Sequence, residues 1–235
     1  MYGGIVMIEI INTEIMGWEA AIRGMRNSWN SWEKSDSVFE RHDDCNEDCC
    51  KCHLQFEECS VQQIGDNDRD LMIRLRNAGT DHRKFMRMIT VYVDITAPMY
   101  WWSEFDTYKV GTVANSCSKM HKIAEKEFTL ENFSCEHLLG YDDLKLGDTC
   151  PLVTLECVIS ALNVYRKKYL ETKDKKYWWQ MIQLLPSSYN QRRTVMLNYE
   201  VLANIYKSRK NHKLDEWVEF CKWIEKLPYS EIITG

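Results

Sequence analysis

The segment MITVYVDI, residues 88–95, does most to limit the folds open to this chain, because a proline follows it closely at position 98. β-Branched residues alternate with other side chains along this segment, as is typical of a strand. Proline disfavours helical backbone in the residue before it but suits the first turn of a helix. We therefore expect the strand to end before Pro98 and a helix to begin there. A second compact β-branched run, IVMIEIIN at residues 5–12, predicts a buried strand, so the chain should contain a sheet.

Patterns with helical periodicity cover much of the remaining chain, and from Pro151 onward they dominate. Asp66 or Asn67 can cap one of these helices and Gly79 can end it. The predicted helices cover residues 17–25, 67–79, 98–111, 154–171, 175–186, a long stretch within 184–217, and 215–228. At 235 residues the chain is long enough for one large domain. The predicted fold is a single α+β domain over residues 1–235, with a small sheet and long helices.

Composition and charge exclude several classes of protein. The net charge of −5 argues against a general nucleic-acid binder, although a local basic pocket for one phosphate remains possible. No apolar run approaches the roughly 20 residues that a membrane span needs. The first residues, MYGGIVMIEIINTEI, show no basic region or small-residue cleavage site of a secretory signal. We therefore expect a cytoplasmic protein that binds neither nucleic acid nor membrane.

A cysteine-rich segment at residues 41–60 is predicted to be an insertion in the domain. Thiolate and imidazole groups at this density can hold zinc, but their spacing does not match a paired C-x2-C site. The segment is also rich in Asp and Glu, so a reduced, metal-free acidic loop is the expected state. A zinc-stabilised interaction protein is the alternative. The possible ligands are Cys45, Cys49, Cys50, Cys52, Cys59, His42 and His53.

The C-terminal stretch LLPSSYNQRRTVMLNYEVLANIYKSRKNHKLDEW, residues 184–217, carries polar residues among its hydrophobic ones. Asn198, Asn204, Arg209 and His212 either form the polar back of an amphipathic helix or converge on a ligand. A Leu-Pro pair comes first, and Arg209 lies eleven residues after Asn198. This order resembles the C-terminal region of the flavin-dependent thymidylate synthases. Tyr199 and Asn204 stand where that family has an Arg and a His.

A second resemblance to the same family lies in the middle of the chain. The family signature R-H-R-x-x-S-x-N-x-x-S-x-R falls without gaps on TYKVGTVANSCSK, residues 107–119. Most of the signature residues differ here. Thr112 keeps the hydroxyl of the first Ser, and Lys119 keeps the positive charge of the last Arg. The positions that correspond to signature letters are Thr107, Tyr108, Lys109, Thr112, Ala114, Cys117 and Lys119.

This resemblance implies the fold of the thymidylate synthase-complementing proteins and a homotetramer. It further implies an enzyme that binds FAD and converts dUMP to dTMP by reductive methylation. Methylene-tetrahydrofolate and NADPH would be its co-substrates. The alternative is a non-catalytic relative that keeps the fold and a nucleotide pocket and has a binding or regulatory role.

The resemblance also implies roles for particular residues. Arg209 is the predicted catalytic residue, because its equivalent contacts the pyrimidine and stabilises developing negative charge. The competing interpretation is a helix-face Arg paired with a nearby carboxylate such as Glu216. The other predicted substrate-binding residues are Lys119, Thr112 and Cys117, where lysine can bind phosphate as a point charge. The predicted cofactor-binding residues are Lys109, Tyr108, Thr107, Asn198, Asn204, His82 and Arg83.

Four tryptophans have two possible uses each. Trp101 and Trp102 either stack on a flavin or base or pack in the core. Trp29 and Trp32 lie in a polar stretch, NSWNSWEKSDS, and either cover a ligand site or fold back onto the domain surface.

Overall fold

The computed structural model describes residues 7–41, 60–116, 118 and 122–235, and these residues form two compact units. Of the described residues, unit 1 comprises 7–14, 92–116, 118, 122–196 and 208–223, and unit 2 comprises 15–41, 60–91, 197–207 and 224–235. The cysteine-rich positions 42–59 lie outside the described residues, so the metal-free loop expected there stays a prediction. Among the helices of the described part of the chain, none has both the length and the apolar composition needed to cross a bilayer.

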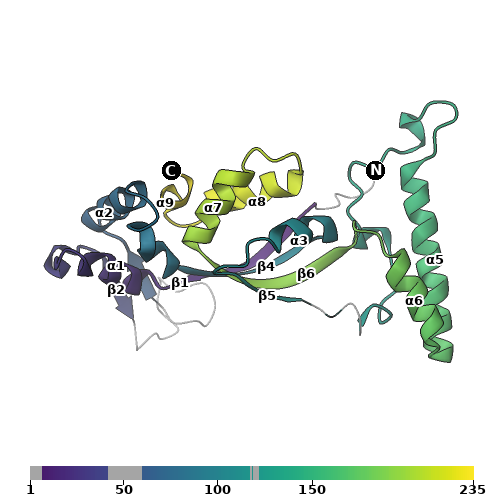
Figure 1. Cartoon of the computed structure of the whole chain (residues 1–235), viewed down its shortest axis with the longest axis horizontal. Coiled ribbons are helices and arrows are strands. Elements are labelled where there is room, and N and C mark those ends of the chain that lie inside the picture. The colour runs from purple at the N-terminus through teal and green to yellow at the C-terminus, as the bar shows by residue number, and fades with distance from the viewer. Residues whose placement is uncertain (1–6, 42–59, 117, 119–121) are drawn as a thin grey trace, which may run out of the picture. The chain divides into compact units, whose positions relative to one another are not determined.

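A small antiparallel sheet of four strands is central to the α+β fold, as predicted (Figure 1). The strand order is β1-β4-β6-β5. Val113 of β5 lies opposite Met196 of β6, and Ser116 lies opposite Arg193. A separate two-stranded antiparallel sheet joins β2 to β3. The strands are β1 (Glu9–Met16), β2 (Val38–Arg41), β3 (Ser60–Gln63), β4 (Thr90–Pro98), β5 (Val113–Ser116) and β6 (Asn190–Asn198).

The junction at Pro98 confirms the prediction that a strand gives way to a helix there. β4 ends at Pro98, whose backbone is extended, and α3 (Met99–Phe105) begins at the next residue. Buried residues alternate along β4, as expected for a strand with one face in the core. The helix is shorter than the 98–111 that the sequence predicted, because the chain turns at residues 106–107.

The prediction of one long helix within residues 184–217 was wrong. Residues 190–198 form β6, and only Tyr199–Arg209 form a helix, α7. Gln191, Val195 and Leu197 are buried and have odd residue numbers, which fits the two-residue period of a strand. Pairing with the neighbouring strands of the sheet therefore overrides the helical interpretation of this stretch.

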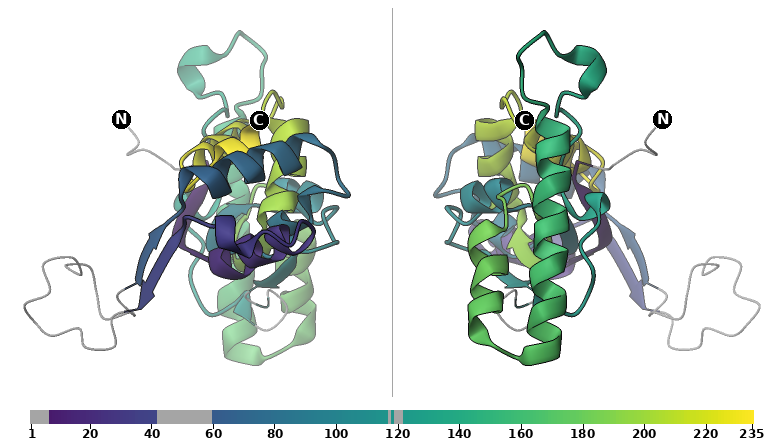
Figure 2. Two further views of the ribbon diagram at one scale, coloured as in Figure 1. Left: turned by 90° about the vertical axis from the view of Figure 1, so that its left-hand side faces the viewer. Right: turned by 90° about the vertical axis from the view of Figure 1, so that its right-hand side faces the viewer.

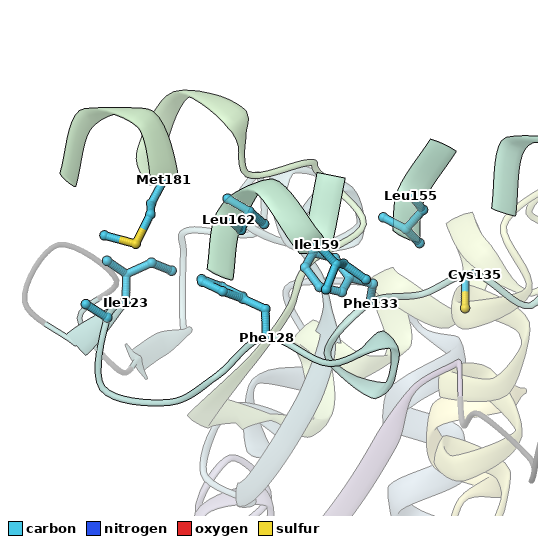
Figure 3. Close-up of a cluster of buried hydrophobic side chains, with 9 residues drawn as sticks. Ile123, Phe128, Phe133, Cys135, Leu155, Ile159, Leu162 and Met181 are labelled. Atoms are coloured by element: carbon cyan, nitrogen blue, oxygen red, sulfur yellow. The ribbon is translucent and has the colours of Figure 1, made fainter. Parts of the chain in front are cut away.

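A helical hairpin in unit 1 confirms the two helices predicted after Pro151. α5 (Pro151–Thr172) begins with that proline, and α6 (Lys175–Leu184) is capped by the carboxylate of Asp174, which accepts from the backbone N–H of Lys176. Figure 2 shows the two helices packed side by side. Between them and the loops before α5 lies a cluster of buried side chains (Figure 3). Its members are Ile123, Ala124, Phe128, Phe133, Cys135, Leu155, Ile159, Leu162 and Met181.

A second core in unit 1 is built from aromatic rings on α3 and α8 (Asp215–Glu225). The Trp101 ring lies 4.6 Å from the Trp217 ring and stacks on Phe105 at 5.1 Å. Trp101 and Trp102 are both fully buried. Of their two predicted uses, core packing is therefore the one that the structure confirms.

Unit 2 contains α1 (Trp18–Asn27), α2 (Asp66–Asn77), α9 (Glu231–Thr234) and most of α7. The ring of Trp18 contacts Tyr199 at 5.1 Å and Tyr229 at 5.2 Å. Gly17 has a φ of +95°, and a Cβ there would lie 2.1 Å from the carbonyl oxygen of Met88. Only glycine fits at this close approach, so it fixes the turn into α1.

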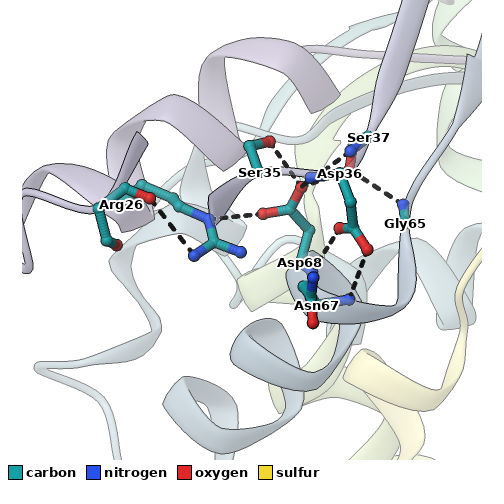
Figure 4. A network of polar contacts seen from close by, with 8 residues as sticks. Arg26, Ser35, Asp36, Ser37, Gly65, Asn67 and Asp68 are labelled. Atoms are coloured by element: carbon teal, nitrogen blue, oxygen red, sulfur yellow. Dashed lines mark hydrogen bonds and ion pairs between the residues drawn. The ribbon is translucent and has the colours of Figure 1, made fainter. Parts of the chain in front are cut away.

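A buried carboxylate, Asp68 of α2, holds the loop after α1 in place (Figure 4). One of its oxygens accepts from Arg26 Nε at 2.7 Å. The other accepts from the hydroxyls of Ser35 at 2.7 Å and Ser37 at 2.6 Å and from two backbone N–H groups. Asp36 accepts from the N–H groups of residues 67 and 68 and thereby caps α2. Asp66 and Asn67, the caps expected from the sequence, lie instead inside the helix.

Trp29 and Trp32, in the same loop, are both exposed, and Trp32 Nε1 donates to Asn27 Oδ1 at 2.7 Å.

Candidate functional site

Arg209, the predicted catalytic residue, is the last residue of α7 and lies in a polar cluster in unit 1. Its Nη1 donates to Glu104 Oε2 at 2.6 Å and lies 2.9 Å from His212 Nε2. Its Nε donates to the Tyr108 hydroxyl at 3.0 Å. The guanidinium also lies over the ring of Trp217, 4.8 Å from the ring centre. The three hydrogen-bond partners and the Trp217 ring thus fix the plane of the guanidinium. The Arg209 side chain is still 18% exposed.

Glu104, on α3, connects this cluster and was not predicted from the sequence. Besides Arg209, it accepts from Trp217 Nε1 at 3.0 Å, and His212 Nε2 lies 3.5 Å away. Arg209 is therefore paired with a carboxylate, but the partner is Glu104 and not Glu216. The sequence separation of 105 residues between the two partners explains why no local pattern showed the pair.

Glu216 has a different partner in the same unit. Its carboxylate is buried and accepts from the hydroxyl of Tyr100, which also lies 2.9 Å from Ser134 Oγ. Burial raises the pKa of Tyr100, and the adjacent Glu216 carboxylate raises it further. Tyr100 therefore stays protonated and acts as a hydrogen-bond donor.

The segment that resembles the family signature begins directly after α3. Thr107 Oγ1 donates to the carbonyl of Glu104 at 2.7 Å, so it closes the end of the helix. Lys109 is exposed. Thr112 Oγ1 is buried and has no hydrogen-bond partner among the residues that the structure describes. Of this segment, the structure brings Tyr108 to Arg209, whereas Cys117 and Lys119 lie outside the described residues.

A small cavity of about 90 Å³ lies beside this segment in unit 1. Lys122 and Arg192 are the basic side chains of its lining, and Lys122 is paired with Glu125. The Oδ1 atom of Asn190 is buried without a partner among the described residues. Arg192 was not singled out from the sequence, although strand alternation places it on the same side of β6 as Thr194. The lining residues are Ser118, Lys122, Ile123 and residues 189–192.

Asp94 on β4 anchors the basic lining. It accepts from Arg192 Nη2 at 2.6 Å, from Thr194 Oγ1 at 2.6 Å and from Asn12 Nδ2 at 2.9 Å. These hydrogen bonds, with that of Thr194 the largest, lower the pKa of Asp94 to about 2. Asp94 is therefore ionised at neutral pH and holds Arg192 in position.

The remaining predicted cofactor-binding residues lie in unit 2. Arg83 donates to Glu200 Oε1 at 3.2 Å and to Asn204 Oδ1 at 3.1 Å, and Arg87 donates to both oxygens of the same glutamate. Burial alone would raise the pKa of Glu200, but the hydrogen bonds from Arg87 and Arg83 outweigh it and lower this pKa. The predicted residues Arg83 and Asn204 are thus brought together in one cluster around Glu200.

The other two predicted cofactor-binding residues of unit 2, Asn198 and His82, each lie at the start of a helix. Asn198 Oδ1 accepts from the N–H of Val201 at 3.0 Å, so its side chain caps α7. His82 precedes the 3-10 helix η2 (Arg83–Arg87) and is exposed. The Asn198 side chain thus has a structural contact, and contact of either residue with a cofactor stays a prediction.

No protein-family model and no curated protein matches this sequence. Solved structures do match. Flavin-dependent thymidylate synthase ThyX from Helicobacter pylori, complexed with FAD and dUMP, is 16% identical, with a TM-score of 0.65 over 96% of this chain and 97% of that chain. A second ThyX structure from Helicobacter pylori with FAD and dUMP is 17% identical, with a TM-score of 0.63 over 96% of each chain.

A third match is the UMP/dUMP methylase PolB from Streptomyces cacaoi bound with 5-Br dUMP. It is 13% identical, with a TM-score of 0.56 over 97% of this chain and 94% of that chain. At these identities the matches show the fold alone. The chain has a ThyX-like fold along nearly its whole length, which confirms that part of the resemblance seen in the sequence.

Proposed function

We propose that this protein is a divergent flavin-dependent thymidylate synthase that converts dUMP to dTMP. FAD would be its cofactor, methylene-tetrahydrofolate and NADPH its co-substrates, and a cytoplasmic homotetramer its working form. Support comes from the ThyX-like fold, whose solved examples include structures with FAD and dUMP. The observation that carries the proposal is the geometry of Arg209 within that fold.

The guanidinium of Arg209 is oriented but keeps one donor group available. Nε and Nη1 are engaged by Tyr108, Glu104 and His212, whereas Nη2 has no hydrogen bond to any residue that the structure describes. The pyrimidine of dUMP offers carbonyl oxygens as acceptors. A donor that is fixed before binding stabilises the negative charge that develops on such an oxygen during attack through C5. Arg209 is the proposed catalytic residue on this basis.

The small cavity beside β6 is the proposed site of the nucleotide phosphate. Its volume of about 90 Å³ is far below the roughly 300–1,000 Å³ of pockets that hold a whole small molecule, so it would take one group of the ligand. Lys122 and Arg192 supply hydrogen-bond donors there, and each is also paired with a carboxylate, Glu125 and Asp94. Thr112 Oγ1 is an additional hydroxyl without a partner in the described part of the chain. Cys117 and Lys119 stay proposed substrate-binding residues from the resemblance.

The cluster in unit 2 fits the charge of a flavin dinucleotide. Arg83 and Arg87 share the single carboxylate of Glu200, and Lys84 lies on the same short helix, so positive charge exceeds negative charge there. These residues would hold the two phosphates of FAD, and His82, Asn198 and Asn204 complete the proposed set in this unit. Thr107, Tyr108 and Lys109 are the proposed contacts in unit 1. When bound, reduced flavin supplies the hydride.

A non-catalytic nucleotide-binding protein is the second candidate function. Its support is the close pair between Arg209 and Glu104, at 2.6 Å, which neutralises the cation that catalysis would use. The replacement of two basic signature positions by Thr107 and Tyr108 favours it as well. Both candidates require nucleotide binding, and only the first requires flavin.

The visible absorption spectrum of the purified protein, measured after FAD addition and desalting, separates the two candidates. A retained flavin band that shifts on addition of dUMP supports the enzyme, and NADPH oxidation dependent on dUMP then tests turnover. Without a retained band, the flavoenzyme proposal fails and the nucleotide-binding candidate remains.

The Arg209→Met variant tests the site in the same assay. It should weaken dUMP binding about tenfold to a hundredfold, because a charged hydrogen bond to the pyrimidine is lost. Lys207→Met, an exposed change on the same helix, is the matched control. Equal dUMP affinity of the two variants would show that Arg209 does not contact the nucleotide.

A further inference from the structure

Unit 2 contains a second, larger cavity that plays no part in the proposed reaction. Its volume is about 660 Å³, and it lies between the end of α1, the 3-10 helix η1 (Trp32–Lys34) and one face of α2. Asn67, Asp70 and Arg74 follow one another at helical spacing on α2, so they share that face. The lining residues are Arg26, Lys34, Asn67, Asp70, Ile73 and Arg74.

The lining carries more positive than negative charge. The charge of Arg26 is balanced by Asp68. Lys34 and Arg74 form no ion pair with any residue that the structure describes, and Asp70 is the single acidic side chain of the lining. One positive charge is therefore left over, and the two unpaired cations come from different elements of the unit.

Arg26 provides an independent sign that a ligand group is missing. Its side chain is only 6% exposed, and its Nε is held by Asp68 at 2.7 Å. Its Nη1 lies 3.5 Å from the carbonyl oxygen of Ser31, which is a long contact. Its Nη2 is buried and has no partner among the described residues. A buried charged donor without an acceptor is costly, and a shift of the Arg26 side chain on binding would bring this donor to an anionic oxygen in the cavity and remove that cost.

We propose that this cavity binds a small organic phosphomonoester that carries hydroxyl groups, such as a sugar phosphate. Arg74 and Lys34 would bind the phosphate, since arginine donates to phosphate through two parallel N–H groups, and Nη2 of Arg26 would join them once its side chain shifts toward the ligand. The site is separate from the nucleotide site proposed above, which lies in unit 1.

The rest of the lining explains why the ligand is larger than a free phosphate ion. A volume of about 660 Å³ falls in the range of roughly 300–1,000 Å³ that is typical of small-molecule pockets. Asp70 would repel a bare anion, but it accepts hydrogen bonds from hydroxyl groups. Asn67 can donate and accept, and Ile73 offers an apolar surface to the carbon skeleton. These groups suit the polyhydroxylated part of a sugar phosphate.

Isothermal titration of the full-length protein with ribose 5-phosphate, inorganic phosphate and ribose tests the proposal. Ribose 5-phosphate should bind more tightly than inorganic phosphate, and ribose should show no binding. Arg74→Ala and Lys34→Ala should each weaken binding of ribose 5-phosphate about tenfold or more. Arg23→Ala, on α1 but outside the cavity, should leave it unchanged, because Arg23 is exposed and paired with Glu19.

Two further variants separate this site from the nucleotide site and from a simple anion site. Arg209→Met should leave ribose 5-phosphate binding unchanged, so failure of the proposed enzyme function would not affect this result. Asp70→Asn should strengthen binding of inorganic phosphate and narrow its difference from ribose 5-phosphate. The proposal is overturned if ribose 5-phosphate does not bind, if Arg74→Ala binds it as tightly as the unmodified protein, or if inorganic phosphate binds equally well.

Discussion

Replacing Asp68 by Asn would test whether the buried carboxylate holds unit 2 together. The carboxylate is fully buried, and five donors converge on its two oxygens. An Asn side chain has one oxygen and one NH₂ group. If its oxygen faces Ser35 and Ser37, the NH₂ group opposes Arg26 Nε. If it is turned round, the NH₂ group opposes the serine hydroxyls and two backbone N–H groups.

The expected loss follows from the charge that either arrangement leaves behind. Arg26, with 6% of its side chain exposed, would lose its only charged partner among the described residues. Breaking a buried ion pair by removing one partner costs about 3–5 kcal/mol. The total free energy of unfolding of a domain is roughly 5–15 kcal/mol, so the change is a large fraction of it. A loss of about 4 kcal/mol should lower the urea midpoint by more than about 1 M.

The pH dependence of the free energy of unfolding is a second, independent test of this prediction. Burial alone would raise the pKa of Asp68, but hydrogen bonds from Ser37, Ser35 and Arg26 outweigh it and hold this pKa below its ordinary value. The carboxylate therefore stabilises the fold fully above the unfolded-state pKa of about 3.9, and this contribution disappears as the pH falls through the lower folded pKa. The difference between the unmodified protein and Asp68→Asn should be constant from about pH 8 to 5 and should narrow below about pH 4.

Urea unfolding, followed by circular dichroism and tryptophan fluorescence at several pH values, measures both effects. Asp142→Asn, an exposed change in the 3-10 helix η4 (Tyr141–Asp143), is the control and should change the free energy of unfolding by less than about 0.5 kcal/mol. A loss below about 1 kcal/mol for Asp68→Asn at pH 7, or a difference that grows in acid, would refute the reasoning.

Three further changes test other parts of the chain. Asp94→Asn should cost about 1–3 kcal/mol in urea unfolding at pH 7, because three side chains donate to this carboxylate. Since its pKa is lowered to about 2, the cost should vanish as the pH falls from about 4 toward 2. Phe133→Ala should lower stability by about 3–5 kcal/mol, whereas Leu146→Ala, at a fully exposed position, should change it little. Glu104→Gln should weaken dUMP binding in titration calorimetry by about tenfold, because Arg209 loses the carboxylate that orients it; an unchanged affinity would exclude this positioning role.

Local sequence signals predicted the elements whose causes are local. The alternation along residues 88–95 and the fixed φ of Pro98 were enough to place a strand next to a helix. Pro151 marked the start of α5 in the same way. In the segment NQRRTVMLN, alternation is clear only in the second half, and its pairing partners lie far away in the chain. Strand pairing decided this element, although a helix was predicted from its sequence.

The features of the candidate site also separate into those that the sequence determined and those that the tertiary structure decided. The sequence alone determined the α+β class, the identity and spacing of Asn198 and Arg209, and through them the resemblance that the fold comparison supports. Only the tertiary structure decided which groups face Arg209. Glu104 and Tyr108 lie 105 and 101 residues away along the chain, and their approach depends on the packing of the aromatic rings of α3 and α8. Short-range preferences act within a turn or a strand, whereas an ion pair between residues far apart in the sequence requires that distant segments be packed together first.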